Sequence, residues 1–241
     1  MPRANDPHMA HAVVALLEHL SIATEPTVDF SEQFLFWAAK MRDTDPNPLA
    51  DGTFIRCAKD VLQSVGVCEE SFWHYNGTPI AGNVTQEQPP GIPTPTAIAN
   101  ANTHTHSAAL FNDTFNPPAG AAQALCSALQ TAQRPVAISL PVFADPLTPK
   151  NDNWQTLVGW QYGRVLDPPP GAVVIAGHAI CITGFAPDPA EPMGGYFVLR
   201  NSWSGAWGAG NPSPNSKGPE QGYGWISASY IENHLWEMCQ L

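Results

Sequence analysis

The chain of 241 residues is poor in charge, because only 13% of its residues are Asp, Glu, Lys or Arg. Basic residues are the scarcest, with 10 against 21 acidic ones, which leaves a net charge of −11. Nucleic acids and anionic membranes bind basic surfaces, so we expect neither as a partner. The sequence also has no run of the roughly 20 apolar residues that a membrane-spanning helix needs.

A disulfide framework and a signal peptide are also missing. The start of the chain has no basic segment followed by a long apolar core, which a secretory signal would show. The cysteines are odd in number and irregularly spaced: Cys57, Cys68, Cys126, Cys181 and Cys239. This pattern favours buried free thiols in a reducing compartment, so we expect a cytoplasmic location. An excised domain of an exported protein would have the same pattern, and this alternative stays open.

Turn-forming residues and apolar residues are plentiful. The 25 Pro and 19 Gly residues indicate many structured loops, and the hydrophobic fraction of 44% is ordinary for a globular protein. A chain of this length suffices for one sizeable core or for two lobes that share an interface.

The N-terminal part predicts three helices. Asp6 is placed to cap the first helix and Pro7 fits its first position. The apolar residues of this helix recur at helical spacing: Met9, Val13, Leu16, Leu17 and Leu20. A second helix is predicted over 31–41 with Ser31 as its N-cap. A third is predicted over about 53–64 and ends at Gly66.

The rest of the chain is predicted to be mainly β-structure. Residues from about 76 to 118 are rich in Pro, Asn, Thr and Gly, which indicates a long ordered crossing. A short helix is expected over 120–132. Strands are then expected within 135–143, 172–185, 194–203 and 222–231. Alternation of side chains in 178–182 and 196–199 predicts half-buried antiparallel strands.

Several motifs resemble the papain family of cysteine peptidases, in particular its bacterial papain-like branch. His178 lies in GHAICITGF and Asn201 lies in NSWSGAWG, which is followed by GYGWIS. Upstream, the runs SEQFLFW, DGTFIRCAKDVLQSVGVCEESFWHY and RPVAISLPVF resemble the same family, so the likeness spans almost the whole chain. It implies a single papain-like α+β domain of two lobes with a cleft between them. The helical lobe would comprise about residues 1–115, and the antiparallel β-rich lobe about residues 116–241.

The resemblance also implies roles for the residues of these motifs. His178 would be the general base, and Asn201 would orient its imidazole ring, as the second and third members of a catalytic triad. Trp203 and Trp207 would shield the bond between them from water. A histidine that is merely buried in a strand is the alternative, and the Asn-Ser-Trp sequence argues against it.

The nucleophilic cysteine of the family has no counterpart. The family carries a Glu ten residues after that cysteine, and Glu18 matches it, so His8 falls at the nucleophile's position. Met9-Ala10-His11 replaces the family's Trp-Ala-Phe. The Gln that supplies an amide to the oxyanion hole is also missing, and Asp6 is the residue nearest to its place. None of the five cysteines combines a helix N-terminus or a cationic neighbour with the right position to substitute.

Three functions follow from this pattern. The first is a pseudopeptidase that binds a peptide or protein ligand in the cleft without cleaving it, and it needs no cofactor. The second is an active cysteine peptidase whose N-terminal segment is truncated or altered in this sequence, as its unusual start suggests. The third is a metal site built from His8, His11 and His178, because neutral imidazoles are good ligands for zinc or copper. His8 and His11 without any special role are the alternative to this third function.

Overall fold

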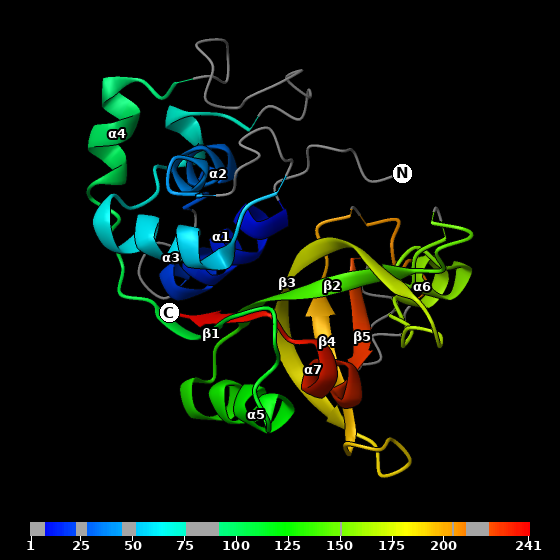
Figure 1. Cartoon of the computed structure of the whole chain (residues 1–241). Coiled ribbons are helices and arrows are strands. Elements are labelled where there is room, and N and C mark those ends of the chain that lie inside the picture. Colours follow the sequence, from blue (N-terminus) through cyan, green and yellow to red (C-terminus); the bar gives the residue numbers. More distant parts are fainter. Residues whose placement is uncertain are drawn as a thin grey trace. The chain divides into compact units, whose positions relative to one another are not determined.

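A computed structural model describes residues 8–22, 28–44, 52–75, 92–149, 151–203, 205–210 and 222–241 (Figure 1). Internal contacts divide the chain into two compact units. Unit 1 comprises Met1–Phe111 and Cys239–Leu241, and unit 2 comprises Asn112–Met238. None of the helices in the described residues is long and apolar enough to cross a membrane.

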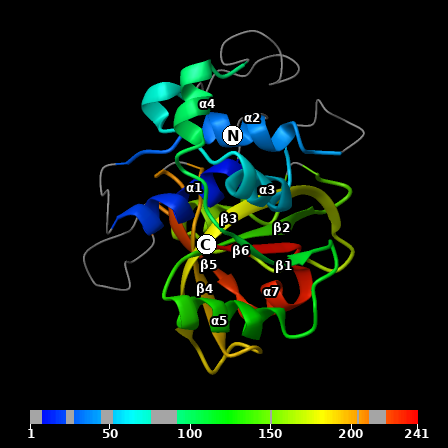
Figure 2. The ribbon, with the colours of Figure 1, turned by 90° about the vertical axis from the view of Figure 1, so that its left-hand side faces the viewer.

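Unit 1 is built on three helices, namely α1 (His8–Ser21), α2 (Glu32–Lys40) and α3 (Ile55–Ser64), which pack against one another (Figure 2). The predicted apolar face of the first helix is confirmed, since four of its five members are buried: Met9, Val13, Leu16 and Leu17. Its expected first residues, Asp6 and Pro7, lie outside the described part of the chain.

The predicted cap of α2 is confirmed. The Ser31 side-chain oxygen accepts a hydrogen bond from the Phe34 backbone N–H at 3.0 Å. The Ser31 hydroxyl donates to the Trp73 carbonyl at 2.6 Å, and its backbone N–H donates to the Cys68 carbonyl at 2.9 Å. One residue therefore starts the helix and also ties it to the segment that contains the short 3₁₀ helix η1 (Glu70–Phe72).

Gly66 ends the third helix as predicted. Its φ of +79° is left-handed, and a Cβ here would lie 2.1 Å from the Ala101 carbonyl oxygen, so only glycine fits. That carbonyl belongs to α4 (Pro95–Ala101), a helix that the sequence did not predict within the crossing. It begins with Thr94, whose side chain accepts from the Ala97 N–H. The crossing therefore contains a helix and the strand β1 (Ala109–Asp113), while residues 76–91 lie outside the described part.

The sheet has the strand order β1-β6-β2-β3-β4-β5. Its other strands are β2 (Val136–Ala144), β3 (Val173–Pro187), β4 (Gly195–Arg200), β5 (Tyr223–Ser227) and β6 (Glu237–Gln240). The pairs β2–β3, β3–β4 and β4–β5 are antiparallel, and β2 lies beside β3 as two long strands in Figure 1. The predicted antiparallel arrangement of the β-rich part is confirmed for these pairs.

The predicted alternation of burial is confirmed in one strand and wrong in another. In β4, Phe197 and Leu199 are fully buried and Val198 between them is partly exposed. In β3, however, the five residues of 178–182 are all buried. Both faces of this stretch are covered, so the polar character of His178 did not indicate an exposed face.

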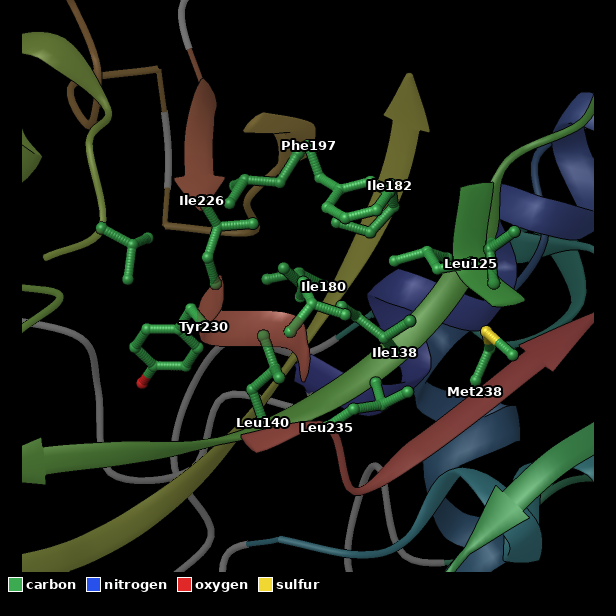
Figure 3. Packing of buried hydrophobic residues seen from close by; sticks show 14 of the residues in the cluster. Leu125, Ile138, Leu140, Ile180, Ile182, Phe197, Ile226, Tyr230, Leu235 and Met238 are labelled. Carbon is green, nitrogen blue, oxygen red and sulfur yellow. The ribbon is translucent and has the colours of Figure 1, made fainter. Parts of the chain in front are cut away.

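The hydrophobic core of unit 2 lies between the sheet and two helices, α5 (Ala121–Ala132) and α7 (Ala228–His234). Figure 3 shows side chains from strands and helices meeting there: Leu125, Ile138, Leu140, Ile180, Ile182, Phe197, Ile226, Tyr230, Leu235 and Met238. The helix expected over 120–132 is confirmed. Another helix of this unit, α6 (Leu157–Tyr162), lies in the connection between β2 and β3.

The strand expected within 222–231 is too long. β5 ends at Ser227, whose side chain accepts from the Tyr230 N–H at 3.0 Å and so caps α7. The apolar residues Tyr230 and Ile231 then enter the core from a helix and not from a strand. The Ser227 cap ends the strand and starts the helix, and the apolar pattern of so short a segment does not distinguish a helix from a strand.

Gly224 allows the loop around Trp207 to pack against β5. A Cβ at this position would lie 2.0 Å from the Gly163 carbonyl oxygen and 2.5 Å from the Trp207 ring. We expect Gly224→Ala to lower the free energy of unfolding by about 1–3 kcal/mol, because backbone and a fully buried ring would have to move. Urea unfolding followed by tryptophan fluorescence measures this change.

Gly184→Ala is the matched control for Gly224→Ala. A Cβ at Gly184 would meet only Val198 methyl and Cβ atoms, at 3.8 and 3.9 Å, which is ordinary contact. Its stability should stay within about 0.5 kcal/mol of the unchanged protein. Equal losses in the two variants would contradict the packing argument.

Candidate functional site

His178 and Asn201 form a buried hydrogen-bonded pair within unit 2. The ring nitrogen Nε2 of His178 lies 2.8 Å from Oδ1 of Asn201. His178 is in the middle of β3, and Asn201 directly follows β4, whose last residue Arg200 pairs with Cys181. The strand register thus brings together two residues that are 23 positions apart, and both are less than 10% exposed.

The chemistry of this pair fixes which ring nitrogen of His178 can act as a base. An amide oxygen only accepts hydrogen bonds, so Nε2 carries the proton and Nδ1 keeps its lone pair in the neutral ring. Burial lowers the pKa of His178 to about 4, and the hydrogen bond to Asn201 opposes this shift without overcoming it. At neutral pH the imidazole is uncharged and is able to take a proton at Nδ1.

Two indole rings cover the imidazole of His178. The Trp203 ring lies 4.7 Å from it with an interplanar angle of 33°, and the Trp154 ring meets it edge-on at 4.9 Å. Trp207 lies edge-on to Trp203 at 6.4 Å and is fully buried. Such apolar cover excludes water, and a hydrogen bond in a low-dielectric environment is stronger than one in water. The geometry suits the shielding role that the resemblance implies for Trp203 and Trp207, and that role stays a prediction.

Trp154 was missed in the sequence because it stands in a polar stretch of the β2–β3 connection. The carboxylate of Asp152 holds this stretch, accepting from the backbone N–H groups of Trp154 at 2.9 Å and of Gln155 at 2.8 Å. An Asp that caps its own turn in this way is the signal that could have marked an ordered loop. A tryptophan directly after such a turn is a candidate to be buried.

His8 and His11 lie on α1 in unit 1. The Nδ1 of His11 is 3.1 Å from the Glu32 carboxylate, and its ring meets the Tyr75 ring edge-on at 5.5 Å. His8 is the first residue of α1, and its side chain lies outside the described part. No group of three or more His, Cys, Asp and Glu side chains able to hold a metal ion is found among the described residues. The metal site of His8, His11 and His178 includes a side chain that is not described, so it stays a prediction.

Glu18, which matches the glutamate of the family motif, is partly buried on α1. Burial, together with the neighbouring carboxylates of Glu32 and Asp29, raises its pKa to about 7. The carboxyl group is therefore partly protonated near neutral pH.

Four of the five cysteines have raised pKa values. Burial raises the pKa of four thiols, to about 12 in two of them: Cys57, Cys68, Cys126 and Cys181, with Cys68 and Cys181 the extreme cases. A nucleophilic cysteine needs its pKa lowered so that the thiolate forms at neutral pH. The fifth, Cys239, is buried in β6. That no cysteine of this chain takes the nucleophile's place stays a prediction.

Sequence comparison with protein-family models and with curated proteins finds no match. Structural comparison finds solved structures with a similar fold. Xylellain, a cysteine protease from Xylella fastidiosa, matches with a TM-score of 0.66 at 18% identity, over 99% of this chain and 82% of its own. The fold is that of papain-like cysteine proteases.

Two further structures share this papain-like fold. Digestive procathepsin L 3 of the Tenebrio molitor larval midgut matches with a TM-score of 0.56 at 16% identity, over 97% of this chain and 63% of its own. The Carica candamarcensis cysteine protease CMS1MS2, in complex with E-64, matches with a TM-score of 0.51 at 18% identity, over 97% and 93%. The predicted papain-like α+β fold is therefore confirmed, and identities this low carry the fold alone.

The depressed pKa of His178 makes stability depend on pH. The unfolded chain binds a proton at this residue near the ordinary value of about 6.5, whereas the folded protein binds it only near 4. The stabilising contribution is complete above about pH 6.5 and is lost as the pH falls toward 4, by up to about 3 kcal/mol. Urea unfolding at a series of pH values should show a steeper loss for the unchanged protein than for His178→Gln.

This comparison isolates His178 from other titrating groups. Glu18 titrates in the same range with the opposite sign, because its pKa is raised, but it does so equally in both proteins. Parallel stability curves for the two proteins between pH 7 and 4.5 would contradict a buried, neutral His178.

Proposed function

We propose that the protein is a papain-like peptidase homologue without a cysteine nucleophile, which binds peptide or protein segments beside His178 and does not cleave them. The observation that carries this proposal is the His178–Asn201 hydrogen bond of 2.8 Å beneath the rings of Trp203 and Trp154. This contact supports the roles of base for His178 and of orienting residue for Asn201, while the described thiols with raised pKa values are neutral.

The chemistry of acyl transfer explains why such a site would not turn over a peptide. His178 can accept a proton at Nδ1, but general-base catalysis needs a nucleophile that gives up this proton and attacks the carbonyl. By resemblance, His8 stands at the nucleophile's position, and the oxyanion-hole amide has no counterpart in the sequence. Loss of the nucleophile and of this donor removes most of the rate advantage of such enzymes.

A peptide epoxide that alkylates catalytic cysteines tests the missing nucleophile. We expect intact-mass spectrometry to show no labelling of the protein. His8→Cys should be labelled, because this change restores a thiol where the resemblance assigns it. His8→Cys combined with His178→Ala should be labelled far more slowly, since the base is absent.

Each outcome of the labelling experiment has a definite meaning. Stoichiometric labelling of the unchanged protein at any of its five cysteines would overturn the proposal in favour of an active cysteine peptidase. If His8→Cys stays unlabelled, the assignment of His8 to the nucleophile's position is wrong.

Binding without cleavage is the second expected property. Fluorescein-labelled lysozyme that has been reduced and carbamidomethylated serves as an unfolded protein probe, and native lysozyme is its folded control. Fluorescence anisotropy should show saturable binding of the unfolded form only, and electrophoresis after long incubation should show it intact. Fragments of the probe, or equal binding of both forms, would contradict the proposal.

A further inference from the structure

The first five residues of β3 are exposed although they belong to a long strand of the sheet. Val173, Val174 and Ile175 are 45%, 51% and 42% exposed, and the next two residues up to Gly177 are exposed as well. A strand that lies on a core buries every second side chain, so the exposure of 173–176 shows that neither face of this stretch is covered, whereas a Cβ at Gly177 would lie 2.8 Å from the Trp236 ring. The following residue, His178, is buried.

At this end of the β2–β3 pair, the edge of β2 that faces away from β3 is already occupied. The Phe143 carbonyl accepts from the Asn153 backbone N–H at 2.9 Å, and the Phe143 N–H donates to the Asn153 side-chain oxygen at 2.8 Å. Ala144 forms a bridge with Asp152 next to it. The outer backbone groups at this end of β2 are therefore occupied by the β2–β3 connection.

The edge of β3 that faces away from β2 has no strand beside it in the described residues at this end. Val174 lies directly opposite Phe143 in the antiparallel register. Opposite residues in such a pair exchange both backbone hydrogen bonds or neither, and Phe143 uses both of its groups for Asn153. The N–H and C=O of Val174 therefore point away from β2. β4 pairs with β3 only from Cys181 onward, so within the described part of the chain no strand covers the edge at 173–177.

The composition of this edge suits an added strand. Natural edge strands are usually protected by lysine, proline or short length, and 173–177 (VVIAG) contains neither lysine nor proline. β-Branched residues at three consecutive positions favour strand pairing. We propose that the edge at 173–177 binds an extended peptide as an additional β-strand through the backbone of Val174. This rests on the proposed function, because the edge runs directly into His178.

Charge selects the kind of segment that the edge binds. The edge itself is uncharged, and the chain as a whole carries a net charge of −11. Two copies of so acidic a chain repel each other, which disfavours a second copy as the occupant. The partner is therefore an extended segment with apolar, β-branched residues at its centre and basic residues at its ends.

Hydrogen–deuterium exchange of the whole protein locates the bound segment. The probe is an acetylated decapeptide of alternating valine and threonine with lysine at both ends. We expect it to slow amide exchange in 173–177 and to bind with the same affinity to Val174→Thr, which keeps the N–H and the branched shape. Val174→Pro removes this N–H and should weaken binding about tenfold or more.

A second variant tests the same edge in case Val174→Pro fails to fold. Val174→Lys places a charge on the edge as natural edge strands do, and it should also weaken binding about tenfold. Leu157→Lys is the matched control for Val174→Lys, because Leu157 is an exposed apolar residue of unit 2 that lies on α6. The Leu157→Lys variant should bind the decapeptide with unchanged affinity.

The outcomes separate this inference from the proposed function. If the peptide binds and slows exchange elsewhere but not in 173–177, the edge inference is wrong and peptide binding stands. If neither the peptide nor unfolded lysozyme binds, the binding function itself is wrong. If exchange in 173–177 slows with rising protein concentration alone, and sedimentation shows dimers, a second copy occupies the edge and the inference is overturned.

Discussion

The candidate site depends on the register between β3 and β4. His178 and Asn201 meet only because the end of β4 lies beside Cys181, three residues after the histidine. A slip of one residue would turn every side chain of the strand to the other face. The register also shifts between Ile182 and Gly184, where β3 contains one residue more than β4. This extra residue changes the alternation of side chains between the stretch of β3 that contains His178 and the residues after it.

The environment that this register creates determines the basicity of the imidazole. An imidazole buried between two indole rings is costly to protonate, and one hydrogen bond to a neutral amide compensates only part of that cost. His178 consequently has a low pKa and stays neutral at physiological pH. A neighbouring anion such as a thiolate would stabilise the charged ring, but the cysteines with resolved pKa shifts are themselves held neutral by burial. The described residues therefore hold an uncharged imidazole at His178, with a hydrogen bond to Asn201.

Strong local signals made much of the fold predictable from the sequence. Ser31 was predicted to cap a helix, Gly66 to end one, and the alternating residues of β4 to form a half-buried strand. All three predictions are confirmed. Short elements that depend on tertiary packing were missed, such as α4 and the start of α7 at Ala228, because a few apolar residues suit a helix as well as a strand.

The site itself was only partly predictable. The motifs gave the residues His178 and Asn201, and the structure adds their distance and the tautomer that follows from it. Trp154 could not be assigned to the site because its contact with His178 comes from a separate connection of the chain. Contacts of this kind depend on the path of a loop, and periodicity carries no information about such a path.

The strand β3 contains both the buried His178 and the exposed edge at 173–177. At Cys181 and Ile182, β3 is paired with both β2 and β4, and from 178 to 182 both of its faces are buried. Before His178, the same strand keeps its pairing with β2 but has no described neighbour on its other side. The point at which β4 ends determines both properties. It places Asn201 against the histidine, and on that side no strand of the described residues lies beside the backbone of Val174. A peptide segment added to that edge would pair with β3 on the same side as β4 does further along the strand. The end of the segment would lie next to the His178–Asn201 pair.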